Sequence, residues 1–132
     1  CKACKYCLSH EGECVEKDGM IPIMEALYHC DMLVLSTPVY FFGLTAQIKA
    51  VIDRLYPVVV KPLPVKEAVF MSVMADVDME TMVPSVTNFK ELCKYLKWDV
   101  RAILTAGGID EPGDIEGHEI LEQAEKLGSS IK

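Results

Sequence analysis

Residues 32–55 read MLVLSTPVYFFGLTAQIKAVIDRL, and this segment combines the sequence pattern of a buried strand with that of a helix. Its first part, Met32–Ser36, is a continuous apolar run, which is typical of a strand buried on both faces of a parallel sheet. From residue 44 to residue 55, apolar side chains recur at helical spacing on one side, so a helix is predicted. A strand is therefore followed at once by a helix, with residues 37–43 as the loop between them.

The same alternation extends in both directions along the chain. A helix is expected over residues 20–28 with Asp18 as its cap, a second from Pro84 onward, and a last one around 120–127. Further strands are expected over residues 68–74 and 98–105, the first after a proline-punctuated connection. Strands that alternate with helices pair in parallel through right-handed crossovers. The sequence thus predicts an α/β fold with a doubly wound parallel sheet, as one domain over residues 1–132.

The loop after the apolar strand is the first candidate site, because ligands of such sheets bind beyond the carboxyl ends of the strands. A proline stiffens this loop, a glycine permits close backbone approach, and three aromatic side chains offer flat apolar faces. A planar ring would suit these residues, although the aromatic side chains could instead pack against a neighbouring element or subunit. The candidates are Thr37, Pro38, Val39, Tyr40, Phe41, Phe42 and Gly43.

Cysteines supply the second candidate site, within residues 1–14. Cys1, Cys4, Cys7 and Cys14 form a C-x2-C-x2-C-x6-C run, in which the thiols can converge on an iron–sulfur cluster or a zinc ion. Three closely spaced cysteines favour iron, because zinc sites more often divide their ligands into two distant pairs. Structural zinc, or thiols that oxidise to disulfides, are the alternatives.

Composition narrows the possible partners. A net charge of −7 and a pI near 4.9 argue against nucleic acid, which recruits clustered Lys and Arg. No apolar run approaches the roughly 20 residues of a membrane helix. An apolar content of 51% supports a core without cross-links, so the six cysteines favour a reducing, cytoplasmic location over a disulfide framework.

Residues 36–54, STPVYFFGLTAQIKAVIDR, resemble the flavin loop and following helix of the flavodoxin-like NAD(P)H-dependent FMN reductases. Together with the cysteine run and the segment CVEKDGM at residues 14–20, they are most similar to the iron–sulfur flavoprotein branch of that family. The resemblance spans nearly the whole chain, but its specific motifs lie within residues 1–54. It implies a flavodoxin-like sheet of strand order 2-1-3-4-5.

The resemblance also implies cofactors and an activity. Members of the family bind FMN, accept hydride from NAD(P)H or electrons from a ferredoxin-like donor, and pass them to small-molecule or protein acceptors. Members of the cysteine-bearing branch hold a [4Fe-4S] cluster in a homo-oligomer, a dimer or tetramer, where flavin and cluster lie close across subunits. By position, the resemblance implies a cluster on Cys1, Cys4, Cys7 and Cys14 and an isoalloxazine ring against the 37–43 loop. Ala75 and Asp76, after the next strand, are further ring-edge candidates.

One part of the family pattern has no counterpart in these residues. The family's first strand and its phosphate-binding loop precede the cysteines, so we expect the natural protein to be longer and the strand at 32–36 to have an unpaired edge here.

Three other functions remain open from the sequence. The first is a quinone or nitro-compound reductase without a cluster, and the second is a non-catalytic electron carrier. The third is a zinc-stabilised interaction module.

Overall fold

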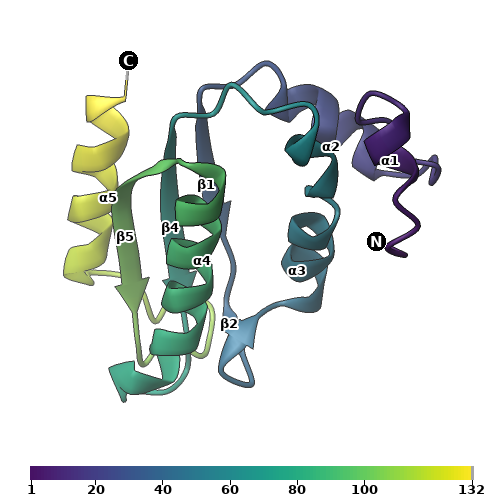
Figure 1. The fold of residues 1–132 in the computed structure, drawn as a ribbon. Coiled ribbons are helices and arrows are strands. Elements are labelled where there is room, and N and C mark those ends of the chain that lie inside the picture. The colour runs from purple at the N-terminus through teal and green to yellow at the C-terminus, as the bar shows by residue number, and fades with distance from the viewer. Residues whose placement is uncertain (132) are drawn as a thin grey trace.

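The structure is a computed structural model that describes residues 1–131 (Figure 1). Helices and strands alternate along the chain after a short first helix, as predicted. In chain order the elements are α1 (Tyr6–Ser9), α2 (Met20–Leu27), β1 (Met32–Ser36), β2 (Val39–Tyr40), β3 (Gly43–Leu44), α3 (Ala46–Asp53), η1 (Tyr56–Val59), β4 (Glu67–Val73), η2 (Met79–Met82), α4 (Val83–Leu96), β5 (Asp99–Ala106) and α5 (Glu119–Ser130).

The main sheet is parallel, with strand order β1-β4-β5. Leu35 of β1 pairs with Phe70 of β4, and Phe70 pairs in turn with Ile103 of β5. Each strand returns to the same edge of the sheet through a helical crossover, which parallel pairing requires. The predicted parallel α/β sheet is confirmed.

Helices cover both faces of this sheet. Successive side chains of a strand point to opposite faces, so adjacent residues of β4 and β5 lie on different sides of the sheet. Phe70 and Ile103 belong to the core beside α4, whereas Met71 and Leu104 line a hollow together with Ile120 of α5. In Figure 1, α5 and the α2–α3 pair lie on opposite sides of the strands. This is the doubly wound arrangement that the sequence predicts.

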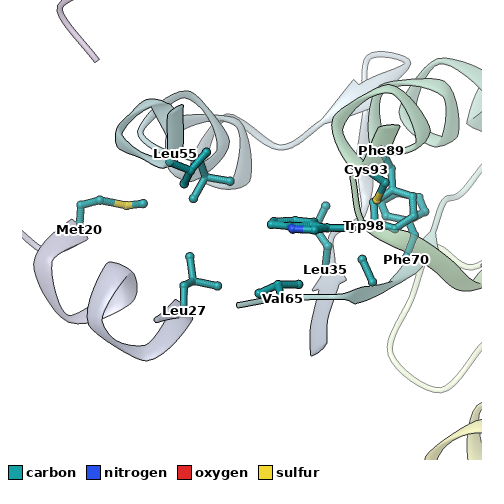
Figure 2. Packing of buried hydrophobic residues seen from close by; sticks show 11 residues of the cluster. Met20, Leu27, Leu35, Leu55, Val65, Phe70, Phe89, Cys93 and Trp98 are labelled. Carbon is teal, nitrogen blue, oxygen red and sulfur yellow. The ribbon is translucent and has the colours of Figure 1, made fainter. Parts of the chain in front are cut away.

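The core lies on the face that α2, α3 and α4 cover. In Figure 2, Met20 and Leu27 of α2 and Leu55, after α3, lie at one side of the core. They face Trp98 and the strands. Phe70 stacks on Phe89 of α4 with ring centroids 5.1 Å apart, and both side chains are fully buried. The core thus fixes α3 along one side and leaves its two ends for other contacts.

Strand β1 differs from its prediction. Leu33 and Leu35 pack against the core, but Val34 between them is 47% exposed, so the strand is not buried on both faces. Within residues 1–131, β4 is the only strand that pairs with β1 in the main sheet, and α5 lies against β5 instead. The expected unpaired edge is therefore present, together with one uncovered face.

The predicted helices are confirmed, with one change of boundary. α2 begins where Asp18 accepts a hydrogen bond from the Met20 amide at 3.0 Å. α3 begins at Ala46, because Leu44 pairs with Val39 in a small hairpin. None of the helices within residues 1–131 has the length and apolar character to span a bilayer.

Candidate functional site

The loop after β1 is a β-hairpin with a strained turn. β2 and β3 pair antiparallel through Val39 with Leu44 and Tyr40 with Gly43, which leaves Phe41 and Phe42 as the two turn residues. Both have left-handed backbone angles, φ 46° and 65°, as the two central residues of a type I′ turn do. Asn and Gly usually occupy these positions, and a bulky side chain there is strained. Strain of this kind concentrates at functional sites.

The glycine of the loop does not carry this backbone conformation. Gly43 has no left-handed φ, and a Cβ there would lie 3.8 Å from the nearest atom, the carbonyl oxygen of Tyr40, an ordinary contact. Among residues 1–131, the expected close approach at Gly43 thus has no counterpart in the contacts of this glycine.

The aromatic side chains of the hairpin point into solvent. Tyr40 is 65% exposed, Phe42 60% and Phe41 100%. The alternative that they pack against a neighbouring element of the same chain is therefore wrong for residues 1–131. Exposed aromatic side chains on one turn form an apolar surface that a planar ligand or another chain can cover.

Buried hydroxyl groups fix the base of the hairpin. The Thr37 hydroxyl lies 3.2 Å from the Thr45 hydroxyl and accepts a hydrogen bond from the Thr45 amide at 3.3 Å. The Thr45 side chain also caps the N-terminus of α3 by accepting from the Ile48 amide. Ser72 of β4 donates to the Thr37 carbonyl at 2.6 Å. Thr37 thus serves as an internal anchor, while the turn beyond it is exposed.

Ala75 and Asp76 lie at the same carboxyl edge of the sheet, because β1 and β4 are parallel neighbours. The Asp76 carboxylate accepts hydrogen bonds from the Thr81 hydroxyl at 2.6 Å and from the Asp78 amide at 2.9 Å. These bonds, the Thr81 bond first, hold the pKa of Asp76 below its ordinary value. The Asp76 side chain therefore orders its own loop.

Gly107 brings the loop after β5 against this segment. A Cβ at Gly107 would lie 2.6 Å from the carbonyl oxygen of Asp76, and that oxygen accepts from the Gly108 amide at 3.0 Å. The backbones after β4 and β5 are thus in direct contact, which holds the 75–79 loop in place.

The four predicted cluster ligands surround one hollow at the other end of the molecule. Cys1, Cys4, Cys7 and Cys14 all line it, the first two exposed and the others half-buried, and all four thiols are free. Within residues 1–131, however, no three His, Cys, Asp or Glu side chains are arranged to hold a metal ion. The thiols are gathered around a shared space but do not converge on one point.

The backbone of this cysteine segment is unusual. Ala3, Lys5, Glu11 and Gly12 all have left-handed φ values between 52° and 85°. Alternating left-handed residues turn successive amide groups toward one side, a geometry found around phosphates and iron–sulfur centres. Gly12 is needed for packing as well, since a Cβ there would lie 3.1 Å from the Lys61 Cβ.

Arg54, which sequence reasoning did not single out, also lines this hollow. Its guanidinium binds Asp18 in a bidentate pair at 2.7 and 3.1 Å, and the side chain is only 14% exposed. One nitrogen also donates to the Cys14 sulfur at 3.4 Å and to the Glu16 carbonyl at 3.5 Å. The Arg54 bond is the first cause that lowers the pKa of Asp18. Asp18 lies in residues 14–20 and Arg54 in residues 36–54, the two segments that resemble the family. Their presence in these segments is the sequence signal that could have singled them out.

Comparison with known protein families shows which family the chain belongs to. A family model described as NADPH-dependent FMN reductase matches residues 2–83, more than half of the chain. The chain belongs to the NADPH-dependent FMN reductase family, as the resemblance of its motifs predicted.

Individual relatives fall within the same class. An iron-sulfur flavoprotein of Archaeoglobus fulgidus is 34% identical over 99% of this chain, which spans 58% of that protein's length. An iron-sulfur flavoprotein of Methanocaldococcus jannaschii is 29% identical over 99% of this chain, which spans 72% of that protein's length. The chain thus spans little more than half of the first relative.

Solved structures confirm the flavodoxin-like fold. The Trp repressor binding protein from Bacillus subtilis superposes with a TM-score of 0.72 at 24% identity, covering 85% of this chain and 73% of that one. The NAD(P)H:quinone oxidoreductase from Methanothermobacter marburgensis gives a TM-score of 0.67 at 18% identity, covering 92% of this chain and 67% of that one.

Proposed function

We propose that the protein is an FMN-dependent oxidoreductase that passes electrons between NAD(P)H, or a ferredoxin-like donor, and an acceptor through FMN and a [4Fe-4S] cluster. The observation that carries the proposal is the exposed, strained aromatic turn at Phe41 and Phe42, at the carboxyl edge of the sheet in a chain of the FMN reductase family.

The hairpin residues fit a flavin ring. Tyr40, Phe41 and Phe42 present apolar faces to solvent on a turn whose base is fixed by the buried Thr37 and Thr45. Aromatic side chains stack on a planar ring through their flat faces, and the anchored base limits how far the turn can move. Bound FMN supplies hydride acceptance and one-electron exchange, while the chain orients the ring and shields it from water.

The cysteine segment supplies the ligand type of the proposed cluster. A zinc ion needs four thiolates about 2.3 Å from one point. In a cubane cluster each thiolate binds a different iron, so the sulfurs stay farther apart around a larger centre. What supports the cluster is the ligand type, since four cysteine thiols line one hollow. The relatives named iron-sulfur flavoproteins support the same proposal.

The two candidate sites lie at opposite ends of α3, which favours a homo-oligomer. Figure 1 shows the β2–β3 hairpin at one end of this helix and the N-terminal cysteine segment beyond the other. Eight helical residues separate the ends by about 12 Å before the length of the hairpin is added. We propose that the hairpin of one copy approaches the cysteine segment of another, which would shorten the path for electrons.

The location we propose is the cytoplasm, because all six thiols are free and a reducing compartment keeps them so.

The test is anaerobic purification followed by absorption spectroscopy and analysis of iron, sulfide, zinc and FMN. We expect FMN together with four iron and four sulfide per chain, and NAD(P)H oxidation with an added acceptor. Cys4→Ser should lose iron and sulfide and keep FMN, whereas Cys93→Ser, at a buried core thiol far from the run in sequence, serves as the matched control. Zinc without flavin would replace the proposal with an interaction module, and FMN without NAD(P)H oxidation would indicate an electron carrier.

A second candidate, the reductase without a cluster, is favoured by the high exposure of Cys1 and Cys4 and the lack of a ready three-ligand arrangement within residues 1–131. FMN and NAD(P)H oxidation without iron or sulfide would select it.

A further inference from the structure

Arg54 is a charged group that contacts a predicted cluster ligand, Cys14. Two hydrogen bonds to Asp18 fix the guanidinium, and the remaining N–H of Nη2 is shared between the Cys14 sulfur at 3.4 Å and the Glu16 carbonyl at 3.5 Å. The side chain is mostly buried, with 14% exposed, so solvent screens its charge less than that of a surface cation.

The other cations around the hollow are arranged differently. Lys2 and Lys5 also line it but are exposed, and Lys2 pairs with Glu16 at 2.7 Å with 74% of its side chain in solvent. Asp18 offsets the formal charge of Arg54. The effect on Cys14 therefore comes from the oriented N–H and the near end of the ion pair, and not from net charge.

We propose that Arg54 is a positioning residue that raises the reduction potential of a cluster held by Cys14. This inference rests on the proposed function. Reduction adds one electron, taken from an external reductant, with no bond broken and no proton required, and part of the added negative charge resides on the ligand sulfurs. A hydrogen bond to a ligand sulfur, donated by a cation, stabilises the reduced form over the oxidised form.

The test is an anaerobic dithionite titration of the reconstituted protein, with the midpoint potential read from the visible and electron paramagnetic resonance spectra. Arg54→Met should lower the equilibrium constant for reduction about tenfold, which is about 59 mV for one electron. Arg54→Lys keeps a cationic hydrogen-bond donor but not the planar guanidinium, so it should lower this equilibrium constant less. Lys94→Met, at an exposed position of α4 outside the hollow, is the matched control and should leave the potential unchanged.

The outcomes separate the inference from the proposed function. Arg54→Met with full iron and sulfide content and the wild-type potential overturns the inference, and so does an equal shift in Lys94→Met. If Arg54→Met does not keep its cluster, Arg54→Lys decides, because it keeps a cation but not the planar guanidinium and should shift the potential downward. An unchanged potential in Arg54→Lys overturns the inference, whereas a wild-type protein that takes up no iron overturns the proposed cluster itself.

Discussion

The turn residues Phe41 and Phe42 make the clearest prediction at the scale of single residues. Each left-handed bulky residue costs about 1–2 kcal/mol. Phe41→Gly should therefore raise the free energy of unfolding by up to about 1 kcal/mol, after the entropy cost of glycine. FMN binding should weaken about 3- to 10-fold, because aromatic stacking contributes about 0.5–1.5 kcal/mol. Urea denaturation and flavin fluorescence titration measure the two effects.

Lys97 provides the matched control for this substitution. It ends α4 with the same left-handed conformation, φ 60°, and its side chain is exposed. Lys97→Gly should stabilise the fold to a similar extent and leave the flavin affinity unchanged. Equal flavin affinity in wild type and Phe41→Gly would remove the hairpin from the binding site.

Among the elements, α3 depends on the hydroxyl pair at its start. Thr37→Val keeps the volume of the side chain but removes the acceptor of the Thr45 amide, which is buried. Loss of a buried partner costs about 1–3 kcal/mol, so the urea midpoint should fall by a corresponding amount. Thr37→Ser keeps the hydroxyl and should lose less. Equal stability of the two variants would show that the hydrogen bonds do not hold the hairpin.

The contact between the loops after β4 and β5 gives a second prediction at this scale. Gly107→Ala places a methyl group 2.6 Å from the Asp76 carbonyl oxygen, so the backbone must move. We expect a loss of about 1–3 kcal/mol, as for other overpacked sites, measured by thermal or urea unfolding. Gly128→Ala, on α5 with no atom within 4 Å of the new methyl group, should instead gain about 0.5–1 kcal/mol.

The elements also show which parts of the structure were readable from the sequence. Helices and parallel strands were predictable because apolar periodicity follows the backbone period, as at Ile48, Val51 and Ile52 of α3. The β2–β3 hairpin was not, because its turn lacks the Asn-Gly or Gly residues that signal a type I′ turn. The exposed face of β1 was missed as well, since an apolar run carries no information on which faces are covered.

The candidate site was predictable in part. The loop and the cysteines were visible as motifs, and the loop follows β1 at the carboxyl edge of the sheet as expected. The anchoring role of Thr37 and the contact of Arg54 with Cys14 were not visible, because both join segments that are distant in sequence. Whether residues 37–43, Ala75 and Asp76 contact FMN stays a prediction.

At the scale of the whole molecule, stability should depend on pH through three carboxylates. Hydrogen bonds from Arg54, Thr81 and the Glu111 amide are the largest causes that lower the pKa of Asp18, Asp76 and Asp114 in the folded chain.

The unfolded chain, with ordinary carboxyl pKa values near about 3.9, takes up these protons first as the pH falls. Stability from the three carboxylates is therefore fully present above about pH 5 and is lost as the pH falls through their folded pKa values. Urea denaturation at several pH values should show constant stability from pH 7 to about 5 and a decline toward pH 3. Asp114→Asn should be less stable at pH 7 and show a shallower decline; the same slope as wild type would contradict the assignment.

The fixing of α3 at both ends has a consequence for how this protein can tolerate insertions and deletions. Thr45 fixes the start of the helix to Thr37, and Arg54 fixes its end to Asp18. One residue added within α3 would rotate one end by about 100° relative to the other and break one of the two attachments. The exposed loop over residues 110–114, between β5 and α5, can change length with far less effect on either end of α3.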